Sequence, residues 1–448
     1  MGNNEKKYIS EEELKTHNKK DDIWISILGK IYNVTNWVNQ HPGGELPLLY
    51  FAGQDVTDVF LAYHPKSSWL YLDKFFTGYY LKDYKVSEIS KDYRKLVTDF
   101  RNIGLFDNKG HGIMILMLIT LIMFCVSVYG VLISNFFSVR LICGGLMGFA
   151  WIQLGWIGHD SAHYQAMINP NFNSLAHFVL VNCLSGVSIA WWKRSHNAHH
   201  IACNALEFDP DMQHLPIFAV SNKFFDSLTS YFYERKMNFG SISRVLVKYQ
   251  NFTFYPIFAF LRIFMYAQSF YLLLSKTKVA NRFKELIGLI IFWIWFPLLV
   301  SSLPNWFERI TFTIVTLAVT GIQQFQFCLN HLSCDAYLGP PSGSNWFEKQ
   351  ISGSLDIECS PWMDWFHGGL QFQIEHHLFP RMPRHQLRKI SPFVKELCKK
   401  HCLPYSSMSF WKANVVTFNT VHAAAIEARE FTNCIPKNML WEAMTTHG

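Results

Sequence analysis

The feature that most restricts the fold of this chain is an uncharged run of 23 residues, Gly112–Ser134. A helix rises about 1.5 Å per residue, so a run of this length can cross the hydrocarbon core of a bilayer, about 30 Å thick. After a short turn at residues 134–138, a second apolar stretch extends over about Val139–Ile157. We therefore predict a transmembrane hairpin whose second helix ends beside His159.

A second hairpin is predicted further along the chain. Its helices cover about Leu286–Leu303 and Ile310–Cys328, with a bend at Pro304–Trp306 between them. Two other apolar stretches, 174–192 and 252–274, are interrupted by polar residues or proline. We predict that these two lie in the membrane interface rather than across the membrane. The expected number of spans is therefore four.

The composition agrees with a membrane protein. Half of the 448 residues are hydrophobic and 16% are charged, against about 25% in typical soluble domains. The formal net charge of +7 is spread along the chain without a basic tract, so no nucleic-acid partner is expected. The ten cysteines form no Cys-x-x-Cys pair, which favours a reducing compartment. The polar N-terminus lacks an apolar core, so no cleavable signal peptide is expected.

Three histidine clusters indicate the chemistry of the chain. Residues three and four apart on a helix share a face, so each cluster can direct its imidazoles one way, and imidazole suits iron, copper, zinc and nickel. Zinc usually takes four ligands, so seven histidines favour two metals over one. The alternative is chance spacing on solvated helices, against which three clusters with doubled histidines argue. The clusters are His159-Asp-Ser-Ala-His163, His196-Asn-Ala-His199-His200 and Gln373-Ile-Glu-His376-His377.

The first 95 residues are soluble in character and precede every long apolar run. Residues 23–27 and 30–34 have the pattern of short strands joined by a turn at Leu28-Gly29. His41, in a His-Pro-Gly-Gly motif, and His64 lie among apolar residues. Two neutral imidazoles facing each other across an apolar slot can hold a haem iron from both sides, and such an iron carries electrons. The alternative is two turn histidines in a small α+β domain.

This stretch resembles cytochrome b5 over about 80 residues. The resemblance rests on His41-Pro-Gly-Gly44, on His64 downstream, and on the segments 24–27 and 32–37 that precede them. It implies haem b as a cofactor and His41 and His64 as the axial ligands of its iron. It also implies an NADH-cytochrome b5 reductase as the partner that supplies electrons.

The remainder of the chain resembles membrane fatty-acyl and sphingolipid desaturases, whose three histidine boxes the clusters match in order and spacing. Gln373 replaces the first histidine of the third box, which together with the fused haem domain is typical of the front-end group. That group places a new double bond between the head-group end and any existing one. The resemblance implies a di-iron centre that uses O₂ and electrons to remove hydrogen from an unactivated CH₂. The implied iron ligands are His159, His163, His196, His199, His200, His376 and His377.

Two further residues receive roles from the same resemblance. His331 stands near the end of the last span, where related desaturases have an additional histidine, and it is expected to be an eighth histidine ligand. Gln373 is expected to be needed for catalysis, as a weak iron ligand or as a hydrogen-bond partner of a bound water.

Other polar residues near the boxes are expected to act indirectly. Asp160 and Glu375 lie inside boxes and are candidates to hydrogen-bond the ligand imidazoles. Glu207, Asp209 and Asp211 follow the second box and could do the same, although a solvated acidic turn explains them equally well. Isolated histidines are expected to satisfy local hydrogen bonds instead: His177, His214 and His367.

These expectations combine into one architecture. An α+β cytochrome b5-like haem domain (residues 1–95) is joined by a linker (96–111) to an all-α polytopic membrane desaturase domain (112–448). The latter has two transmembrane hairpins and a cytosolic di-iron cap. With a cytosolic N-terminus, two hairpins return every histidine box to the cytosol, and the lysines and arginines before the second hairpin agree with this orientation. The expected location is the endoplasmic reticulum membrane.

The lipid substrate is less constrained. The front-end resemblance includes plant enzymes that act at the delta-8 position of a sphingolipid long-chain base, as in ceramide, and others that act at the delta-6 position of an acyl lipid. Likeness at residues 188–192 and 403–410 favours the delta-8 reading, and delta-6 is the alternative. A membrane hydroxylase could use the same boxes, whereas a non-enzymatic haem-bearing adaptor would bind no other iron. The haem domain and Gln373 favour desaturation over both.

Overall fold

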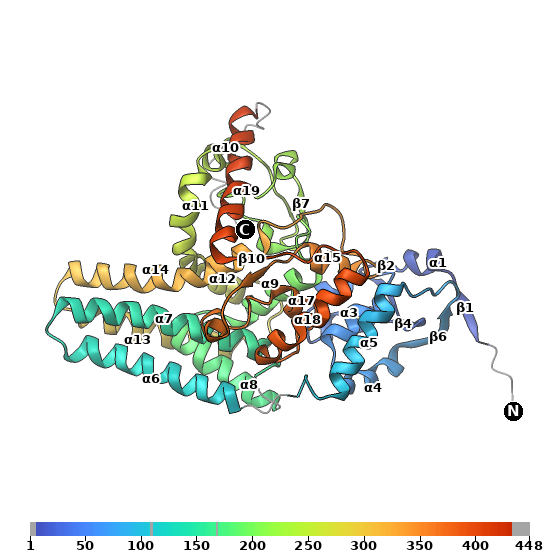
Figure 1. The fold of residues 1–448 in the computed structure, drawn as a ribbon, viewed down its shortest axis with the longest axis horizontal. Coiled ribbons are helices and arrows are strands. Elements are labelled where there is room, and N and C mark those ends of the chain that lie inside the picture. The colour runs from blue at the N-terminus through green and yellow to red at the C-terminus, as the bar shows by residue number, and fades with distance from the viewer. Residues whose placement is uncertain (1–5, 108–110, 167–168, 432–448) are drawn as a thin grey trace.

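The computed structural model describes residues 6–107, 111–166 and 169–431. Figure 1 shows the N-terminal sheet domain at one end and a bundle of long helices at the other. A middle layer of shorter helices lies between them, and α10, α11 and α19 stand to one side of that layer.

The N-terminal domain is built on a mixed sheet with strand order β1-β6-β4-β3-β2, in which β5 also pairs with β3. The antiparallel strands β3 and β4 are joined at Leu28 and Gly29, which both have positive φ (52° and 72°), as two-residue hairpin loops of the primed type require. The strands and the turn that the sequence predicts are therefore confirmed. The strands are β1 (Lys7–Ile9), β2 (Asn18–Lys19), β3 (Asp22–Ile27), β4 (Lys30–Asn33), β5 (Gln54–Asp55) and β6 (Phe76–Leu81).

Short helices cover this sheet and carry the two histidines of the predicted haem site. Ile23, Ile25 and Ile27 of β3 are buried in the core that the sheet shares with these helices. The helices are α1 (Glu11–Thr16), η1 (Thr35–Gln40), α2 (Leu46–Tyr50), α3 (Thr57–Tyr63), η2 (Lys66–Ser68), α4 (Trp69–Leu72), η3 (Asp73–Phe75) and α5 (Glu88–Asn102).

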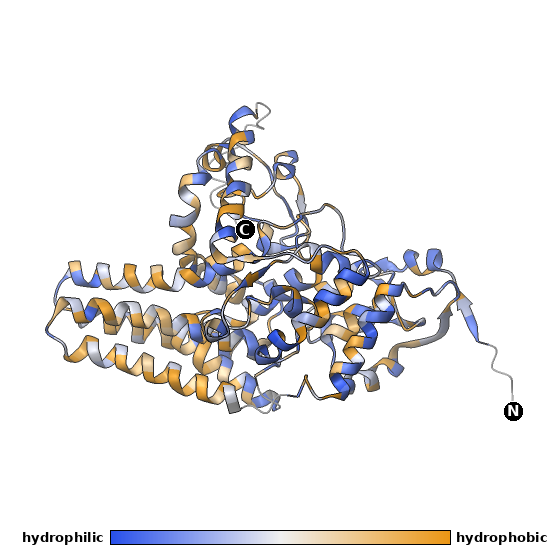
Figure 2. Cartoon of the chain, in the orientation of Figure 1, coloured by the Kyte–Doolittle hydropathy of each residue, from blue (hydrophilic) through white to orange (hydrophobic). Residues whose placement is uncertain are grey.

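Four helices are long and apolar enough to cross a membrane. They coincide with the two predicted hairpins, and Figure 2 shows how apolar residues dominate them. Helix α6 is the most exposed, because only 17% of its most apolar window is buried, as expected of a helix that faces lipid. The four are α6 (His111–Ile133), α7 (Phe137–Ala162), α13 (Arg282–Ser301) and α14 (Trp306–His331).

Close packing of α7 against α14 sets the position of the functional site. A Cβ at Gly148 would collide with the backbone carbonyl of Thr316, so this approach needs glycine. The hydroxyls of Thr316 and Thr320 donate to the carbonyls of Gly144 and Gly148 across the contact, over 3.1 and 3.2 Å. The two helices run parallel, so their C-terminal ends meet in the middle layer (Figure 1).

The two weaker apolar stretches form shorter, interrupted helices. Residues 174–192 divide into α8 (Pro170–Ala176), a π-helix η4 (His177–Cys183) and the start of α9 (Ile189–Ile201). Residues 252–274 lie in α11 (Gln250–Ala259) and α12 (Leu261–Leu274), which are bent by 67° relative to each other. This pair adds a fifth span only if its two helices are counted as one.

The middle layer and its cover are made of short elements. They are η5 (Pro210–Met212), η6 (Asn222–Asp226), β7 (Thr229–Ser230), β8 (Arg235–Lys236), α10 (Ser241–Lys248), α15 (Trp346–Ser352), β9 (Asp356–Glu358), η7 (Pro361–Met363), α16 (Asp364–His367), α17 (Gln373–Leu378), α18 (Arg384–Lys400), β10 (Ser407–Ser409) and α19 (Phe410–Glu430).

The N-terminal domain and the middle layer share one hydrophobic core. Helix α5 continues into the predicted linker and packs the rings of Tyr93 and Phe100 against Phe379, with centroids 5.6 and 5.4 Å apart. The Tyr93 hydroxyl donates to the carbonyl of Leu378 over 2.8 Å. The first part of the predicted linker, residues 96–102, is therefore helical, and it helps to hold the sheet domain in place.

Candidate metal centre

The histidine clusters lie on helices that meet in the middle layer. The first occupies the last turn of α7 and the residue after it, the second lies on α9, and the third lies on α17. His331 is the last residue of α14. The eight histidines and Gln373 are all buried there, and Figure 1 shows α7, α9, α14 and α17 meeting in this layer. The spacing predicted that each cluster directs its imidazoles one way, but the structure divides the second and third clusters between two neighbouring groups.

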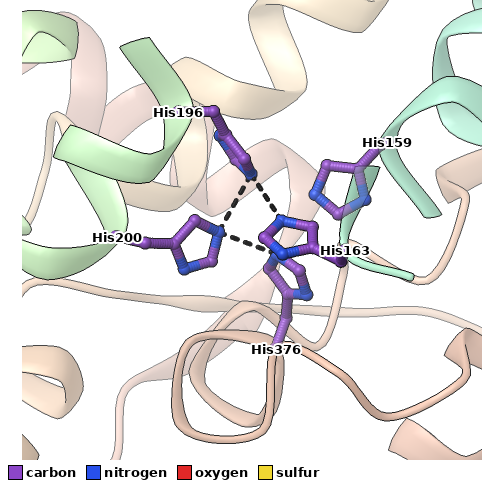
Figure 3. Close-up of side chains that lie close together, drawn as sticks. All are labelled: His159, His163, His196, His200 and His376. Atoms are coloured by element: carbon purple, nitrogen blue, oxygen red, sulfur yellow. Dashed lines mark hydrogen bonds between the residues drawn. The ribbon is translucent and has the colours of Figure 1, made fainter. Parts of the chain in front are cut away.

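Five of these histidines form the first group (Figure 3), and their ring nitrogens lie within 4.8 Å of one another. The Nε2 atom of His196 is 2.9 Å from Nε2 of both His163 and His200, and Nε2 of His376 is 3.1 Å from that of His200. A metal ion bound among these converging ring nitrogens would satisfy them together. The group is His159, His163, His196, His200 and His376.

Burial keeps the rings of this group neutral. It lowers the pKa of His163, His196, His200 and His376 well below the usual value, and the neighbouring imidazoles lower it further. Metal ligands must be deprotonated. The group is thus ready to bind a cation at neutral pH.

A second group lies beside the first and contains His199, His331, His377 and Gln373. The Gln373 side-chain amide donates to Nε2 of His331 over 2.9 Å and to Nε2 of His377 over 3.2 Å. The other amide atom, Oε1, is buried and has no hydrogen-bond partner among the described residues. Cys203 also approaches this group, but its Sγ lies 3.6 Å from Nδ1 of His331, on the outer side of that ring.

Hydrogen bonds to Nδ1 orient all three histidines of the second group. His199 donates to Asp209 over 2.8 Å, His331 to the carbonyl of Gly353 over 2.9 Å, and His377 to Oε1 of Gln350 over 2.7 Å. Such partners fix the tautomer and leave Nε2 for a metal. The residues present therefore fit a second metal ion, bound by three imidazoles with the Gln373 amide beside them.

Asp209 has the largest electrostatic effect on this group. Burial disfavours a charged His199 ring, but the Asp209 carboxylate outweighs it and raises the pKa of His199 to about 9. The carboxylate also accepts hydrogen bonds from the backbone amides of Asn204 and Asp211, over 2.8 and 2.9 Å. A fully buried carboxylate held in this way can orient one ligand ring.

Replacing Asp209 by asparagine is expected to lower metal affinity by about 10- to 100-fold, the usual cost of losing such an outer partner. The measurement is the iron content of purified protein after equilibration with graded chelator. Asp211→Asn is the matched control, because its carboxylate is 3.9 Å from the same Nδ1 and half exposed. Equal iron retention by natural and Asp209→Asn proteins would contradict this role.

The other predicted neighbours of the boxes contact different partners. Glu207 accepts from the backbone amide of Gly339 over 2.9 Å. Asp160 forms an ion pair with Arg384 over 2.5 Å, while its carboxylate is 3.7 Å from Nδ1 of His159. Glu375 accepts from the Tyr405 hydroxyl over 2.8 Å. Of the acids after the second box, Asp209 is thus the one that hydrogen-bonds a box histidine.

The isolated histidines behave as expected. His177 contacts the carbonyl of Gly158 over 2.8 Å through Nε2, and His367 contacts Oε1 of Gln326 over 3.0 Å through Nδ1. Within the described residues, neither these two nor His214 belongs to a metal-binding group.

The N-terminal domain contains the second predicted site. The ring centroids of His41 and His64 are 5.9 Å apart, and each Nδ1 donates to a backbone carbonyl, that of Gly44 over 2.7 Å and that of Phe60 over 3.2 Å. Both Nε2 atoms are left to bind an iron.

Burial lowers the pKa of His64 to about 3, so its ring is neutral at physiological pH. A Cβ at Gly43 would lie 2.8 Å from the His41 ring, which explains a glycine in the motif. These residues fit a haem iron held from two sides.

A cavity opens beside His159, between α7, α9, α12 and α14. Its walls are mostly apolar, with Trp192 stacked on the His196 ring at a centroid distance of 4.2 Å. Arg262 adds a buried cation whose guanidinium donates to Ser185 and to the Tyr266 hydroxyl. Trp362 and Trp365, which follow the last predicted span, do not line this cavity and are 69% and 48% exposed. The apolar lining consists of Val181, Val187, Ile189, Trp192, Met265 and Phe327.

Sequence reasoning did not find Gln350, the Gly353 carbonyl or the cavity residues of α12. Gln350 and Gly353 lie 27 and 22 positions from the histidines that they contact. They belong to no motif, so no local signal marks them.

Comparison with known families agrees with the two sites. The profile described as fatty acid desaturase matches residues 134–409, and the one described as cytochrome b5-like haem/steroid binding domain matches residues 10–81. The first match spans all three histidine boxes, and the second contains His41 and His64.

Curated relatives extend the similarity over nearly the whole chain. An acyl-lipid (9-3)-desaturase of Borago officinalis is 59% identical over 99% of both chains. A delta(8)-fatty-acid desaturase of Helianthus annuus is 55% identical over 99% of this chain and 97% of its own. A delta 8-(E)-sphingolipid desaturase of Emericella nidulans is 36% identical over 67% of this chain and 57% of its own.

Proposed function

Since this chain belongs to the fatty acid desaturase family and carries an N-terminal cytochrome b5-like domain, we propose that it introduces a double bond at the delta-8 position of sphingolipid long-chain bases. It is an oxidoreductase of the front-end desaturase type. The observation that carries the proposal is the pair of adjoining histidine groups beside an apolar cavity.

The two groups are proposed to hold two iron ions. The first would be bound by five imidazoles and the second by His199, His331 and His377, with Gln373 as an amide ligand or a hydrogen-bond partner of a bound water. A di-iron centre supplies an O₂-dependent oxidation strong enough to take hydrogen from an unactivated CH₂. The ligand rings of the groups adjoin, because His200 and His377 stack with centroids 4.2 Å apart. Both ions would therefore lie close to one substrate carbon.

The cavity beside His159 is proposed to hold the alkyl chain of the lipid. Its apolar walls would exclude water from the reacting CH₂ and hold the chain against the first histidine group. Gly148 of α7 packs against Thr316 of α14, and the Thr320 hydroxyl donates to the Gly148 carbonyl, so we propose that the cavity wall is rigid. A rigid wall would fix which carbon lies nearest the metal centre.

The names of the relatives support the delta-8 position and leave one alternative. The Helianthus relative is named for delta-8, and the more distant Emericella relative for delta-8 of a sphingolipid. The 59% identity to an acyl-lipid (9-3)-desaturase favours the second candidate, a delta-6 acyl-lipid desaturase acting on linoleoyl or α-linolenoyl chains. Both candidates use the same metal centre and differ in the lipid that the cavity accepts.

Lipid analysis of yeast that expresses the chain distinguishes the candidates. The cells are fed linoleic acid, and long-chain bases and fatty acids are analysed separately by mass spectrometry, with the His199→Ala variant as control. We expect a new double bond at carbon 8 of the long-chain bases. A delta-6 trienoic acid with unchanged bases would establish the second candidate, and a hydroxylated product would replace desaturation by hydroxylation.

We also propose the remaining organisation of the protein. The domains are 1–95, 96–111 and 112–448, and four spans place the N-terminus and the histidine boxes on the cytosolic side of the endoplasmic reticulum membrane. Both hairpin tips lie at the end of the molecule opposite the N-terminal domain (Figure 1), which supports one shared side for all boxes. An NADH-cytochrome b5 reductase is proposed as the electron donor to the haem domain.

A further inference from the structure

Helix α9, which carries the second histidine box, also contacts the loop of one predicted haem ligand. The side-chain amide of Asn197 donates to the carbonyl of Gly43 over 3.3 Å. Arg194 of the same helix lies 3.8 Å from the carboxylate of Glu45. Asn197 stands between His196 and His199, so the two predicted cofactor sites share this helix as a common wall.

Tyr63 makes the contact at the other haem ligand. It is the last residue of α3 and is joined to His64 by a peptide bond. Its ring packs edge-on against the ring of His200, with centroids 6.1 Å apart and planes at 82°. It also contacts the fully buried Trp346, at 6.3 Å. One side chain therefore links the neighbour of a haem ligand to a histidine of the first metal group.

The Tyr63 hydroxyl does not account for this position. It is buried and has no hydrogen-bond partner among the described residues, although buried phenol groups usually find one. A phenylalanine would fill the same space without that cost. The contacts of Tyr63 with His200 and Trp346 are both made by its aromatic ring.

We propose that Tyr63 is the electron-transfer bridge between the haem and the metal centre, with His64 on one side and His200 on the other. In each step the haem would pass from the ferrous to the ferric state, and the proposed metal centre, which His200 helps to form, would gain one electron. Two such steps and two protons, together with the two hydrogen atoms taken from the lipid, reduce one O₂ to two waters. The reductase then returns the haem to the ferrous state. This inference rests on the proposed function, because it needs both cofactors.

The test is the rate of haem reoxidation in the full-length, haem- and iron-loaded protein. The haem is reduced without O₂, the protein is mixed with O₂ and substrate, and haem absorbance is followed by stopped flow. Tyr63→Leu is expected to slow reoxidation about tenfold or more, equivalent to a barrier increase of about 1.4 kcal/mol. Haem content and the rate of haem reduction by the reductase should not change. Tyr63→Phe, which keeps the ring, should match the natural chain.

Tyr50→Leu is the matched control at the same interface. Tyr50 packs on Phe208 at a centroid distance of 5.0 Å and its hydroxyl donates to the Phe208 carbonyl over 3.5 Å, without a box histidine in contact. Its variant should reoxidise normally. The proposed role of Tyr63 is wrong if haem reoxidation in Tyr63→Leu is as fast as in the natural chain. It is also wrong if reoxidation in Tyr50→Leu or Tyr63→Phe is as slow as in Tyr63→Leu. If the Tyr63→Leu protein does not retain haem, haem reoxidation is measured in Tyr63→Met, which also lacks the aromatic ring.

The same experiment separates this inference from the proposed function. Reoxidation in the natural chain should be lost when iron is omitted. If it is not lost, the proposed di-iron centre fails and the inference fails with it. If iron dependence holds and the Tyr63 variants do not differ, only the bridge fails.

Discussion

His377→Ala is expected to abolish product formation while leaving the haem spectrum intact. His377 belongs to the second metal group, and its ring also stacks on His200 of the first. Removing it would take one of three imidazoles from the proposed second iron site and leave the side-chain oxygen Oε1 of Gln350 without its partner. Loss of an outer partner alone costs about 10- to 100-fold, so loss of a ligand should cost more than that. Iron content should fall from two ions per chain toward one.

His214→Ala is the control for this prediction. His214 contacts the ring of Phe258 at a centroid distance of 5.6 Å and lies in neither histidine group. The His214→Ala protein should retain its iron and its activity. The measurements are product by mass spectrometry, iron by elemental analysis and haem by absorbance. An active His377→Ala protein would remove His377 from the ligand set, and a loss of haem would show that the substitution disturbs more than the metal centre.

His64→Ala is expected to abolish the haem spectrum and, with it, product formation by the chain alone. The ring is held by the Phe60 carbonyl at 3.2 Å and stacks on the Phe60 ring at 4.2 Å, so its position is set before haem binds. Without it, only His41 of the two proposed axial ligands would remain to hold the haem iron. Iron bound at the histidine boxes should be unchanged, because those residues lie on other helices.

His17→Ala is the matched control in the same domain. His17 stacks on Trp24 at 3.7 Å and hydrogen-bonds Asp22 over 2.8 Å, so its loss should leave haem binding and product formation unaffected. Product formation by His64→Ala without added donor would show that the host's own cytochrome b5 suffices. The fused domain would then be dispensable, although the metal centre would stand.

Much of the fold followed from local patterns. The hairpins were predictable because a helical span needs about 20 mostly apolar residues and charged side chains are costly in lipid, and α6, α7, α13 and α14 coincide with the stretches that meet this condition. His41 and His64 were predicted as haem ligands from the His-Pro-Gly-Gly motif and the resemblance to cytochrome b5, and the structure brings their rings to a centroid distance of 5.9 Å. Contacts such as that between Gln350 and His377 could not be predicted, because residues distant in sequence leave no periodic signal.

The sequence by itself determined which histidines are candidate metal ligands, and only the tertiary structure decided how they are divided between two groups. Spacing of four places His196 and His200 on one helix face, while His199 points about 100° away from its neighbour His200. The structure uses this difference by assigning His196 and His200 to one group and His199 to the other. His376 and His377 divide in the same way. Helices α9 and α17 each carry histidines of both groups, and the groups form only where these two helices meet α7 and α14.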